Sequence, residues 1–401
     1  MKALALAAAF TVPLGGSIDN LQVAPDGAAW VHTYRNPGQQ AVRVAPDGAV
    51  RTTELDTGVV AAAIGPEGQA WFMDSSGGLQ RVDASGARTV PRRPGIWDFS
   101  VAYAVAPGPD GVMWTVTTRP RIGVLRLTTG DQPNFTRVSL PGCDATFSHP
   151  DLVRAADGAV WVSDWECDRL VRIAPDGSAR AIPLTQVVLT DIAPDPAGGV
   201  WFSALSPLGG HVSAAGDVTL LRESTPADGE RWGVAIAPDG RPWFATGTCT
   251  LQRVDATGAL ERHPAPIPAR ELAFAPTGRL WLASETRVAH ADAPPSGCDD
   301  RPPRARITTG GTLRRGVRIS VDEAATLRVD LSLRPGGDVD RLVWGPAQVR
   351  TVRAARGRSL RVRLPAEWPR LTRGDEVTVS VHAIDRDGND RTARATLTVR
   401  R

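Results

Sequence analysis

One short motif returns along the first three quarters of the chain. At its first clear occurrence it reads Ala24-Pro25-Asp26-Gly27-Ala28-Ala29-Trp30-Val31. The tryptophans that mark its seven copies lie 38 to 47 residues apart, at Trp30, Trp71, Trp114, Trp161, Trp201, Trp243 and Trp281. A unit of this size cannot bury both of its faces alone, so its copies must stack against one another.

Each copy predicts four short antiparallel strands. An apolar run leads into a turn of the Pro-Asp-Gly type, where glycine supplies a positive φ, and a second run begins at the tryptophan. A third run such as LQRVDASG and a fourth such as RAIPL follow after further turns. Four strands in roughly 40–45 residues are typical of one propeller blade. We therefore predict an all-β protein with a seven-bladed β-propeller, in which these tryptophans and turns serve packing.

The N-terminus has two interpretations. Residues 1–14 resemble a fragment of a secretory signal, because one lysine precedes an apolar run. Blade seven, however, lacks a fourth strand, and residues 10–14 match the strands that end other blades. A strand from the N-terminus would close the ring and remove exposed sheet edges. Both interpretations hold if the chain begins inside a longer precursor, and no segment is long and apolar enough to span a membrane.

The chain divides into a propeller over residues 1–293, a linker over 294–303 rich in Pro and Gly, and a second domain over 304–401. Alternating runs such as ATLRVDLSL predict a small β-sandwich that resembles bacterial immunoglobulin-like or fibronectin-like modules. Residues 301–401 hold 22 Arg against 11 Asp and Glu, while the first 300 residues hold 24 basic and 32 acidic groups. This basic tail is either a tether to an anionic cell wall, polysaccharide or lipid, or a solvated module. We do not expect this domain to bind nucleic acid, because Trp344 and Trp368 are the domain's only aromatic residues and offer no platform for base stacking.

Four cysteines allow two disulfides. Cys143 and Cys167 fall in blade-four loops that share one face of a propeller, whereas Cys249 lies in blade six and Cys298 just beyond blade seven. Their spacing matches no zinc site. Two disulfides would indicate an oxidising compartment, so we expect an extracytoplasmic or secreted protein, although buried free thiols are the alternative.

The repeated Pro-Asp-Gly-x-x-Trp-Phe motif with an Arg-rich third strand resembles the virginiamycin B lyase (streptogramin lyase) family over roughly residues 10–292. That family opens the ester ring of cyclic depsipeptide antibiotics by elimination. The resemblance implies a histidine base, and a Mg²⁺ ion held by glutamates that polarises the carbonyl. It maps one metal glutamate onto Glu285, four residues after Trp281. The family's histidines and its other metal glutamate are not matched, since the chain reads Ala269-Arg270-Glu271 in blade seven and Arg231-Trp232-Gly233 in blade six.

Polar residues gather where the repeats converge on the mouth of the central channel. The inner strands place there Asp19, Asn20, Asp98, His149, Asp151, Asp191, Arg231, Arg270 and Glu271, and the loops after the Trp strands add Asp74, Asp164, Glu166 and Glu285. Carboxylates this close repel one another, which a divalent cation would relieve. We predict catalytic roles for His149 and Glu271, ligand binding by Asp151, Asp191, Arg231 and Arg270, and metal binding by Glu285. The alternative is a set of solvated loop residues.

Two functions remain open at this stage. One is a streptogramin-lyase-like propeller that binds a ligand at the channel mouth, with Mg²⁺ but no organic cofactor, and retains carbon–oxygen lyase activity. The other is a non-enzymatic extracytoplasmic propeller that binds a glycan or protein and is tethered by its basic sandwich. The expected partners are a small molecule, a glycan or a cell-surface component, and the chain is expected to be a monomer. Signatures of common hydrolases and nucleotide-binding enzymes are lacking.

Overall fold

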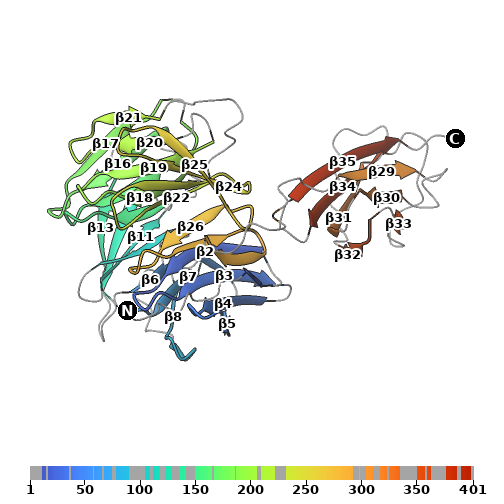
Figure 1. Cartoon of the computed structure of the whole chain (residues 1–401), viewed down its shortest axis with the longest axis horizontal. Helices are drawn as coiled ribbons and strands as arrows, with labels where there is room; N and C mark the ends of the chain where they lie inside the picture. The colour runs from blue at the N-terminus through green and yellow to red at the C-terminus, as the bar shows by residue number, and fades with distance from the viewer. Residues whose placement is uncertain are drawn as a thin grey trace, which may run out of the picture. The chain divides into compact units, whose positions relative to one another are not determined.

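The computed structural model shows an all-β protein, which confirms the predicted fold class (Figure 1). It divides into two compact units, Met1–Cys298 and Asp299–Arg401. The residues that the structure describes are 11–14, 17–35, 38–56, 58–65, 67–74, 78–89, 104–108, 112–117, 123–128, 135–140, 150–164, 167–185, 187–205, 209–221, 232–291, 298, 304–309, 317–322, 325–334, 350–356, 359–362, 376–385 and 390–398. No helix in these ranges is long and apolar enough to cross a membrane.

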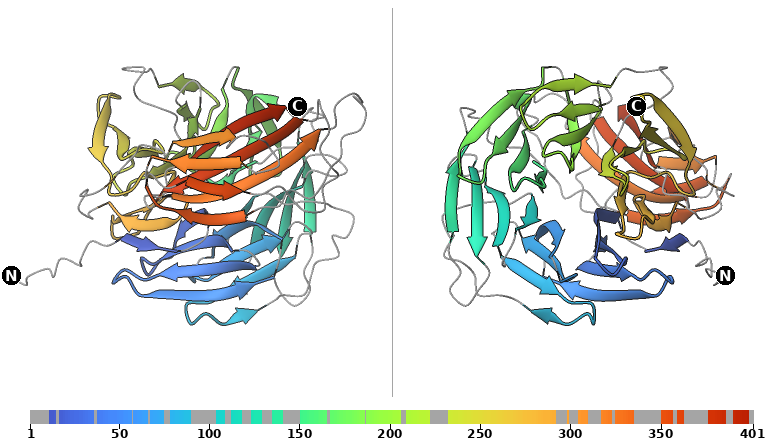
Figure 2. Two further views of the ribbon diagram at one scale, coloured as in Figure 1. Left: turned by 90° about the vertical axis from the view of Figure 1, so that its right-hand side faces the viewer. Right: turned by 60° about the vertical axis from the view of Figure 1, so that its left-hand side comes forward.

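The first unit is built from seven four-stranded antiparallel sheets arranged around one axis (Figure 2). The innermost strands of blades one to seven are β2 (Ser17–Val23), β6 (Val59–Ile64), β10 (Val105–Pro107), β14 (Leu152–Arg154), β18 (Leu189–Pro194), β22 (Gly233–Ile236) and β26 (Glu271–Phe274). The strands that carry the repeated tryptophans are β3 (Ala29–Arg35), β7 (Ala70–Asp74), β11 (Val112–Thr117), β15 (Val160–Asp164), β19 (Val200–Ala204), β23 (Pro242–Ala245) and β27 (Leu280–Ala283).

The outer half of each blade follows the same order. The third strands are β4 (Gly38–Val44), β8 (Leu79–Val82), β12 (Gly123–Thr128), β16 (Arg169–Ile173), β20 (Gly209–Val212), β24 (Thr250–Val254) and β28 (Arg287–His290). The fourth strands of blades one to six are β5 (Val50–Leu55), β9 (Arg88–Thr89), β13 (Phe135–Ser139), β17 (Ala179–Pro183), β21 (Val218–Leu220) and β25 (Leu260–Pro264). In blade seven this position is taken by β1 (Thr11–Pro13), which pairs antiparallel with β28. The two ends of the propeller sequence thus share one sheet.

The repeated Pro-Asp-Gly turn has a local cause. In the first copy, the Asp26 carboxylate accepts a hydrogen bond from the amide of Ala28 at 3.0 Å, and Gly27 has a φ of 84°. An aspartate that caps its own turn and a glycine free of Cβ strain make this reversal favourable. The Trp281 indole of blade seven donates to the carbonyl of Gly27 at 3.0 Å, so the turn of blade one also contacts the preceding blade.

The repeated tryptophan faces the same kind of partner in every blade. The residue directly opposite it on the third strand is always Arg or His, in the pairs Trp30–Arg43, Trp71–Arg81, Trp114–Arg126, Trp161–Arg172, Trp201–His211, Trp243–Arg253 and Trp281–His290. The Arg253 guanidinium lies 5.5 Å from the Trp243 ring centre, within cation–π range. In blades two and six, the arginine of the third strand therefore covers the indole ring.

Seven buried apolar clusters join neighbouring blades. The cluster that closes the ring contains Leu21 and Val31 from blade one together with Trp281 and Val288 from blade seven. Each of the other six clusters likewise draws its residues from two adjacent blades. Burial of apolar surface between blades is the main force that holds such an array together.

Cys249 and Cys298 form a disulfide, and Cys167 is disulfide-bonded as well. Cys143, which the sequence analysis pairs with Cys167, lies outside the described residues. The first of these bonds ties the loop of blade six to the segment that follows blade seven.

The second unit contains two sheets. One has the order β29 (Ala305–Thr309), β30 (Val317–Val321) and β33 (Ser359–Val362), and the other has the order β32 (Arg350–Ala354), β31 (Ala325–Arg334), β34 (Glu376–Asp385) and β35 (Asp390–Thr398). Their inner faces share one apolar core, which includes Ile319 from the first sheet and Val379 from the second. This agrees with the predicted small β-sandwich, while its likeness to immunoglobulin modules stays a prediction.

Candidate functional site at the channel mouth

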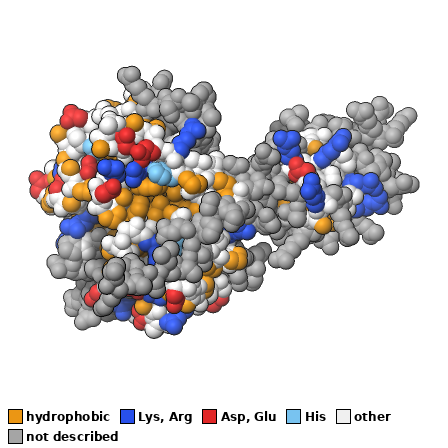
Figure 3. Space-filling model, viewed as in Figure 1, with side chains coloured by type: hydrophobic (Ala, Val, Ile, Leu, Met, Phe, Trp, Pro, Cys, Tyr) orange, Lys and Arg blue, Asp and Glu red, His pale blue; other side chains and the backbone are white. Residues whose placement is uncertain are grey.

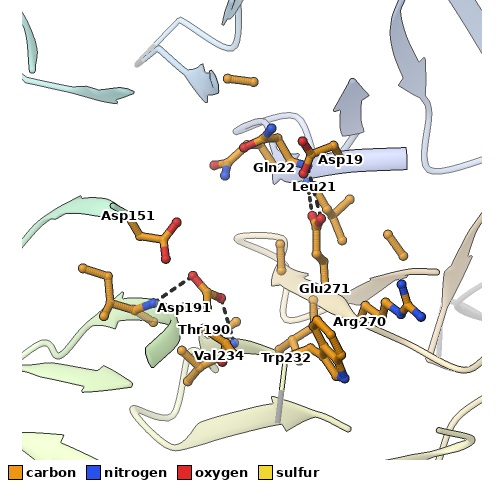
Figure 4. Close-up of a pocket in the computed structure, with 18 of the residues that line it drawn as sticks. Asp19, Leu21, Gln22, Asp151, Thr190, Asp191, Trp232, Val234, Arg270 and Glu271 are labelled. Atoms are coloured by element: carbon orange, nitrogen blue, oxygen red, sulfur yellow. Dashed lines mark hydrogen bonds between the residues drawn. The ribbon is translucent and has the colours of Figure 1, made fainter. Parts of the chain in front are cut away.

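A cavity of about 600 Å³ occupies the axis of the propeller. Residues from the innermost strands of all seven blades line it, and it also reaches Arg270, Glu285 and Trp232 at the blade ends. We call it the mouth cavity. Four of its carboxyl groups belong to Asp19 in blade one, Asp151 and Asp191 in blades four and five, and Glu271 in blade seven (Figure 4).

Glu271 joins the last blade to the first. Its carboxylate accepts a hydrogen bond from the amide of Asn20 at 3.2 Å and another, short one from the amide of Leu21. Asn20 has a φ of 60°, a left-handed conformation that asparagine tolerates better than most residues. The β-bulge between Asp19 and Gln22 accompanies this turn of the backbone. Two successive amides thereby point at one carboxylate across the closure of the ring.

Asp191 makes the equivalent connection between blades five and six. Its carboxylate accepts hydrogen bonds from the amide of Val234 on β22 at 2.9 Å and from the amide of Ile192 at 2.8 Å. A β-bulge between Leu189 and Asp191 interrupts the register of β18 at this point. A bulge re-aims the neighbouring side chain, and here Asp191 points to the adjacent blade (Figure 4).

Asp151 differs from these two carboxylates. Its backbone is fixed by β15, because its amide donates to the Ser163 hydroxyl at 2.7 Å and its carbonyl accepts from the amide of Ser163 at 3.0 Å. Its carboxyl group extends toward Asp191 across the mouth cavity (Figure 4). Within the described ranges, no group donates a hydrogen bond to that carboxylate. Asp151 is thus held in place while its side chain stays available.

Burial and mutual repulsion raise the pKa of these acids. Burial, followed by the charges of Glu271 and Asp19, raises the pKa of Asp151 to about 7. Burial and the charges of Asp19 and Asp191 raise the pKa of Glu271 to about 7, although the amides of Leu21 and Asn20 oppose that rise. The pKa of Asp191 is also raised well above its ordinary value, first by burial and then by the charge of Asp151. At neutral pH the mouth cavity therefore holds a mixture of protonated and ionised carboxyl groups.

Arg270 pairs with Glu285 at the edge of the mouth cavity. Its guanidinium forms an ion pair with Glu285 and lies 5.1 Å from the centre of the Trp232 ring. Its side chain extends away from the carboxylates of Glu271 and Asp191 (Figure 4). The pair of Arg270 and Glu285 forms one rim of the cavity.

Glu285, the glutamate expected to hold a metal, therefore forms an ion pair with Arg270. Among the described residues, no group of three or more His, Cys, Asp or Glu side chains is placed to hold a metal ion. Because Glu285 already pairs with Arg270, a metal at this glutamate would have to displace the arginine. The metal-binding role of Glu285 stays a prediction.

The structure places the other predicted residues in two groups. It brings Asp19, Asn20, Asp151, Asp191, Arg270, Glu271 and Glu285 to the mouth cavity. Asp74 instead accepts a hydrogen bond from the amide of Gly78 in its own loop, and Asp164 forms a buried ion pair with Arg169 at 2.8 Å. The remaining predicted residues, Asp98, His149, Glu166 and Arg231, lie outside the described residues.

Three features of the site were missed from the sequence. Trp232 stacks with Arg270, and Ser163 fixes Asp151. The left-handed Asn20 turns its own amide and that of Leu21 toward Glu271. An asparagine on an inner strand is a weak sequence signal for the left-handed turn at Asn20. Nothing in the repeat marks Ser163 or Trp232, since both depend on contacts between strands.

The fold and cavity define a closed β-propeller with a polar pocket on its axis, the usual place for a ligand site in this architecture. Residues 9–290 match the Virginiamycin B lyase family, and the chain belongs to that family.

Individual relatives agree with this assignment. The chain is 28% identical over 235 residues to a virginiamycin B lyase from Nocardia farcinica (strain IFM 10152), which covers 57% of this chain and 77% of that protein. The structure of virginiamycin B lyase from Staphylococcus aureus matches with a TM-score of 0.59 at 17% identity, over 70% of this chain and 98% of the other. A catalytically inactive form of that enzyme with quinupristin matches with a TM-score of 0.57 at 17% identity and the same coverage. These structures share the fold of this chain.

Proposed function

We propose that this chain binds a small molecule in the mouth cavity and that Asp151 contacts it. The observation that carries the proposal is the Asp151 carboxyl group, which faces a cavity of about 600 Å³ and accepts no hydrogen bond from the described chain. Glu271 and Asp191 each bind backbone amides of the next blade, so their carboxylates are committed to structure. A carboxyl group with a pKa of about 7 can both donate and accept hydrogen bonds at neutral pH.

Family membership suggests the class of ligand. A related enzyme has been studied with quinupristin, and we take a cyclic depsipeptide of this kind as the first probe. The mouth cavity falls within the roughly 300–1,000 Å³ that small-molecule sites occupy. The inner strands also offer backbone amide and carbonyl groups for a peptide-like ligand.

The experiment is a calorimetric titration of quinupristin into the full-length protein. We expect one binding site, and we expect Asp151→Asn to weaken binding at least about tenfold, as loss of a charged hydrogen-bonding group does. Asp47→Asn is the matched control. Asp47 caps a turn through its bond to the amide of Ala49 at 3.0 Å, which asparagine also makes. Equal affinity in the two variants, or no binding by the wild type, would refute the proposal for this ligand.

A second candidate function is the family's elimination reaction with Asp151 as general base. The specific observation in its favour is the pKa of about 7, which suits proton abstraction at neutral pH. Asp151 would remove a proton from the carbon adjacent to the one that bears the ester oxygen, on the alcohol side of the ester, while a double bond forms between these two carbons. The carbon–oxygen bond of the ring then breaks and its oxygen leaves as a carboxylate. No water is consumed, so the opened product has the mass of the lactone.

Mass spectrometry distinguishes this reaction from binding alone. A time course with quinupristin should give a ring-opened product of unchanged mass in the wild type and none with Asp151→Asn. A product heavier by one water would indicate hydrolysis. If quinupristin binds in the calorimeter but no product forms, the binding function stands and the enzymatic function is refuted.

We also propose an extracytoplasmic location. Its support is the disulfide between Cys249 and Cys298, since such bonds persist in oxidising compartments. Alkylation of the protein from its native compartment, before and after reduction, tests this, and alkylation of Cys249 or Cys298 before reduction would contradict it.

A further inference from the structure

The three-stranded sheet of the second unit has one face buried and one face exposed. Its inward residues, Ile307, Val317, Ile319 and Leu360 among them, contribute to the apolar core. Side chains alternate across a strand, so the intervening residues point to the other face. These six positions are Arg306 and Thr308 on β29, Arg318 and Ser320 on β30, and Ser359 and Arg361 on β33. We call them the arginine face.

The arginine face carries three positive charges and no acid at its six positions. Arg306, Arg318 and Arg361 are all exposed. No carboxylate of the described chain forms an ion pair with any of them. The acid nearest in register is Asp322 at the end of β30, and its carboxylate accepts a hydrogen bond from the amide of Arg304 at 2.7 Å. Figure 3 shows Arg side chains spread over the described surface of this unit with few acidic groups between them.

The strand register brings two of these arginines together. Arg318 lies directly opposite Arg361 across the pair β30–β33, and opposite Thr308 across the pair β29–β30. Like charges at directly opposed positions repel and lower the stability of a sheet. An anion bound between the two guanidinium groups would remove that repulsion, and guanidinium groups bind phosphate and carboxylate through paired hydrogen bonds.

We propose that the arginine face binds an anionic glycopolymer, a chain of sugar or polyol units that bears phosphate or carboxylate groups. The hydroxyls of Thr308, Ser320 and Ser359 alternate with the arginines, so the face offers hydrogen bonds to uncharged hydroxyls as well as charge. A lipid surface is disfavoured because the exposed large apolar residues of the described chain all lie in the propeller, as Tyr34, Val50, Val188, Val218 and Leu220. Nucleic acid is disfavoured because the six positions include no aromatic residue for base stacking.

The test uses the full chain and two soluble polymers, polygalacturonate and poly(glycerol phosphate), in a sedimentation or interferometry assay. The double variant Arg318→Gln with Arg361→Gln should weaken binding at least about tenfold. The matched control, Arg126→Gln with Arg262→Gln, removes the same charge from exposed positions on the propeller and should change affinity less than about twofold. Binding should also fall steeply as salt is raised, because it depends on exposed charges.

Three outcomes would overturn the proposal. The first is no binding of either polymer by the wild type. The second is an equal loss in the two double variants, which would indicate general charge attraction. The third is tighter binding to vesicles of an anionic phospholipid or to duplex DNA than to both polymers, which would assign the face to another class of partner. None of the substituted residues lines the mouth cavity, so these variants should bind quinupristin as the wild type does. The two proposals can therefore fail independently of each other.

Discussion

The mouth cavity and the arginine face concentrate opposite charges by different means. The cavity gathers Asp19, Asp151, Asp191 and Glu271 where solvent is restricted, and burial together with mutual repulsion raises the pKa of Asp151, Asp191 and Glu271. The arginine face keeps its three charges exposed, where water and salt screen them. Repulsion is thus costly in the first region and mild in the second. In the mouth cavity, Glu271 and Asp191 also join neighbouring blades through hydrogen bonds to backbone amides.

The largest expected effect concerns a carboxylate that is structural. Glu271→Ala removes two hydrogen bonds that cross the closure of the ring, and bonds to charged groups contribute about 1.5–3 kcal/mol each. Two such bonds together contribute about 3–6 kcal/mol, and relief of the buried, repelled charge offsets part of this, so we expect the free energy of unfolding to fall by about 3 kcal/mol. Denaturant unfolding at pH 7 measures this, with Glu54→Ala as the control at an exposed site. A loss similar to that of the control would show that Glu271 does not join the blades.

A smaller effect of opposite sign is expected at Asp151. A carboxyl group whose pKa is raised in the folded state holds its proton while the unfolded chain releases it. The free energy of unfolding therefore falls as pH rises from about 4 to about 7. Asp151→Asn removes part of this fall, so the variant should match the wild type near pH 4 and exceed it by about 2 kcal/mol at pH 8.

Unfolding of the two proteins across this pH range is the measurement. Asp191 and Glu271 also have raised pKa values, so the variant keeps a reduced slope. Parallel curves for variant and wild type would contradict the account, because they would mean that Asp151 titrates as it does in the unfolded chain.

The smallest effect is expected on the arginine face. Arg318→Thr removes the repulsion with Arg361 and should stabilise the second unit by about 0.5 kcal/mol. Arg306→Thr is the control, because Arg306 lies opposite Ser320. Hydrogen exchange of peptides from β30 and β33 reports on this unit alone. Faster exchange in Arg318→Thr than in the control would show that the opposed arginines do not repel.

The sequence predicted the blades well because each of them repeats one local pattern. The turn at Asp26 and Gly27 and the strand that begins near Trp30 follow from local residue preferences, and the register with Arg43 repeats in every blade. The convergence of acids at the channel mouth followed from the same alignment.

The differences among those acids could not be predicted. Asp151 and Asp191 occupy similar places in consecutive repeats, yet only Asp191 follows a bulge that turns it toward the next blade. Glu271 accepts hydrogen bonds from amides about 250 residues away in sequence, which one left-handed residue exposes, and its catalytic role stays a prediction. The pairing of Arg270 with Glu285 likewise depends on side-chain geometry that spacing does not specify.

The claim that Asp151 is an available, strongly perturbed carboxyl group is tested most directly by its own titration. Carbon-13 NMR of protein labelled at aspartate carboxyl carbons, assigned by the signal lost in Asp151→Asn, follows this group alone. The account predicts a midpoint at about pH 7. A midpoint near the ordinary aspartate value of about 4 would contradict it, since Asp151 would then be a solvated surface acid.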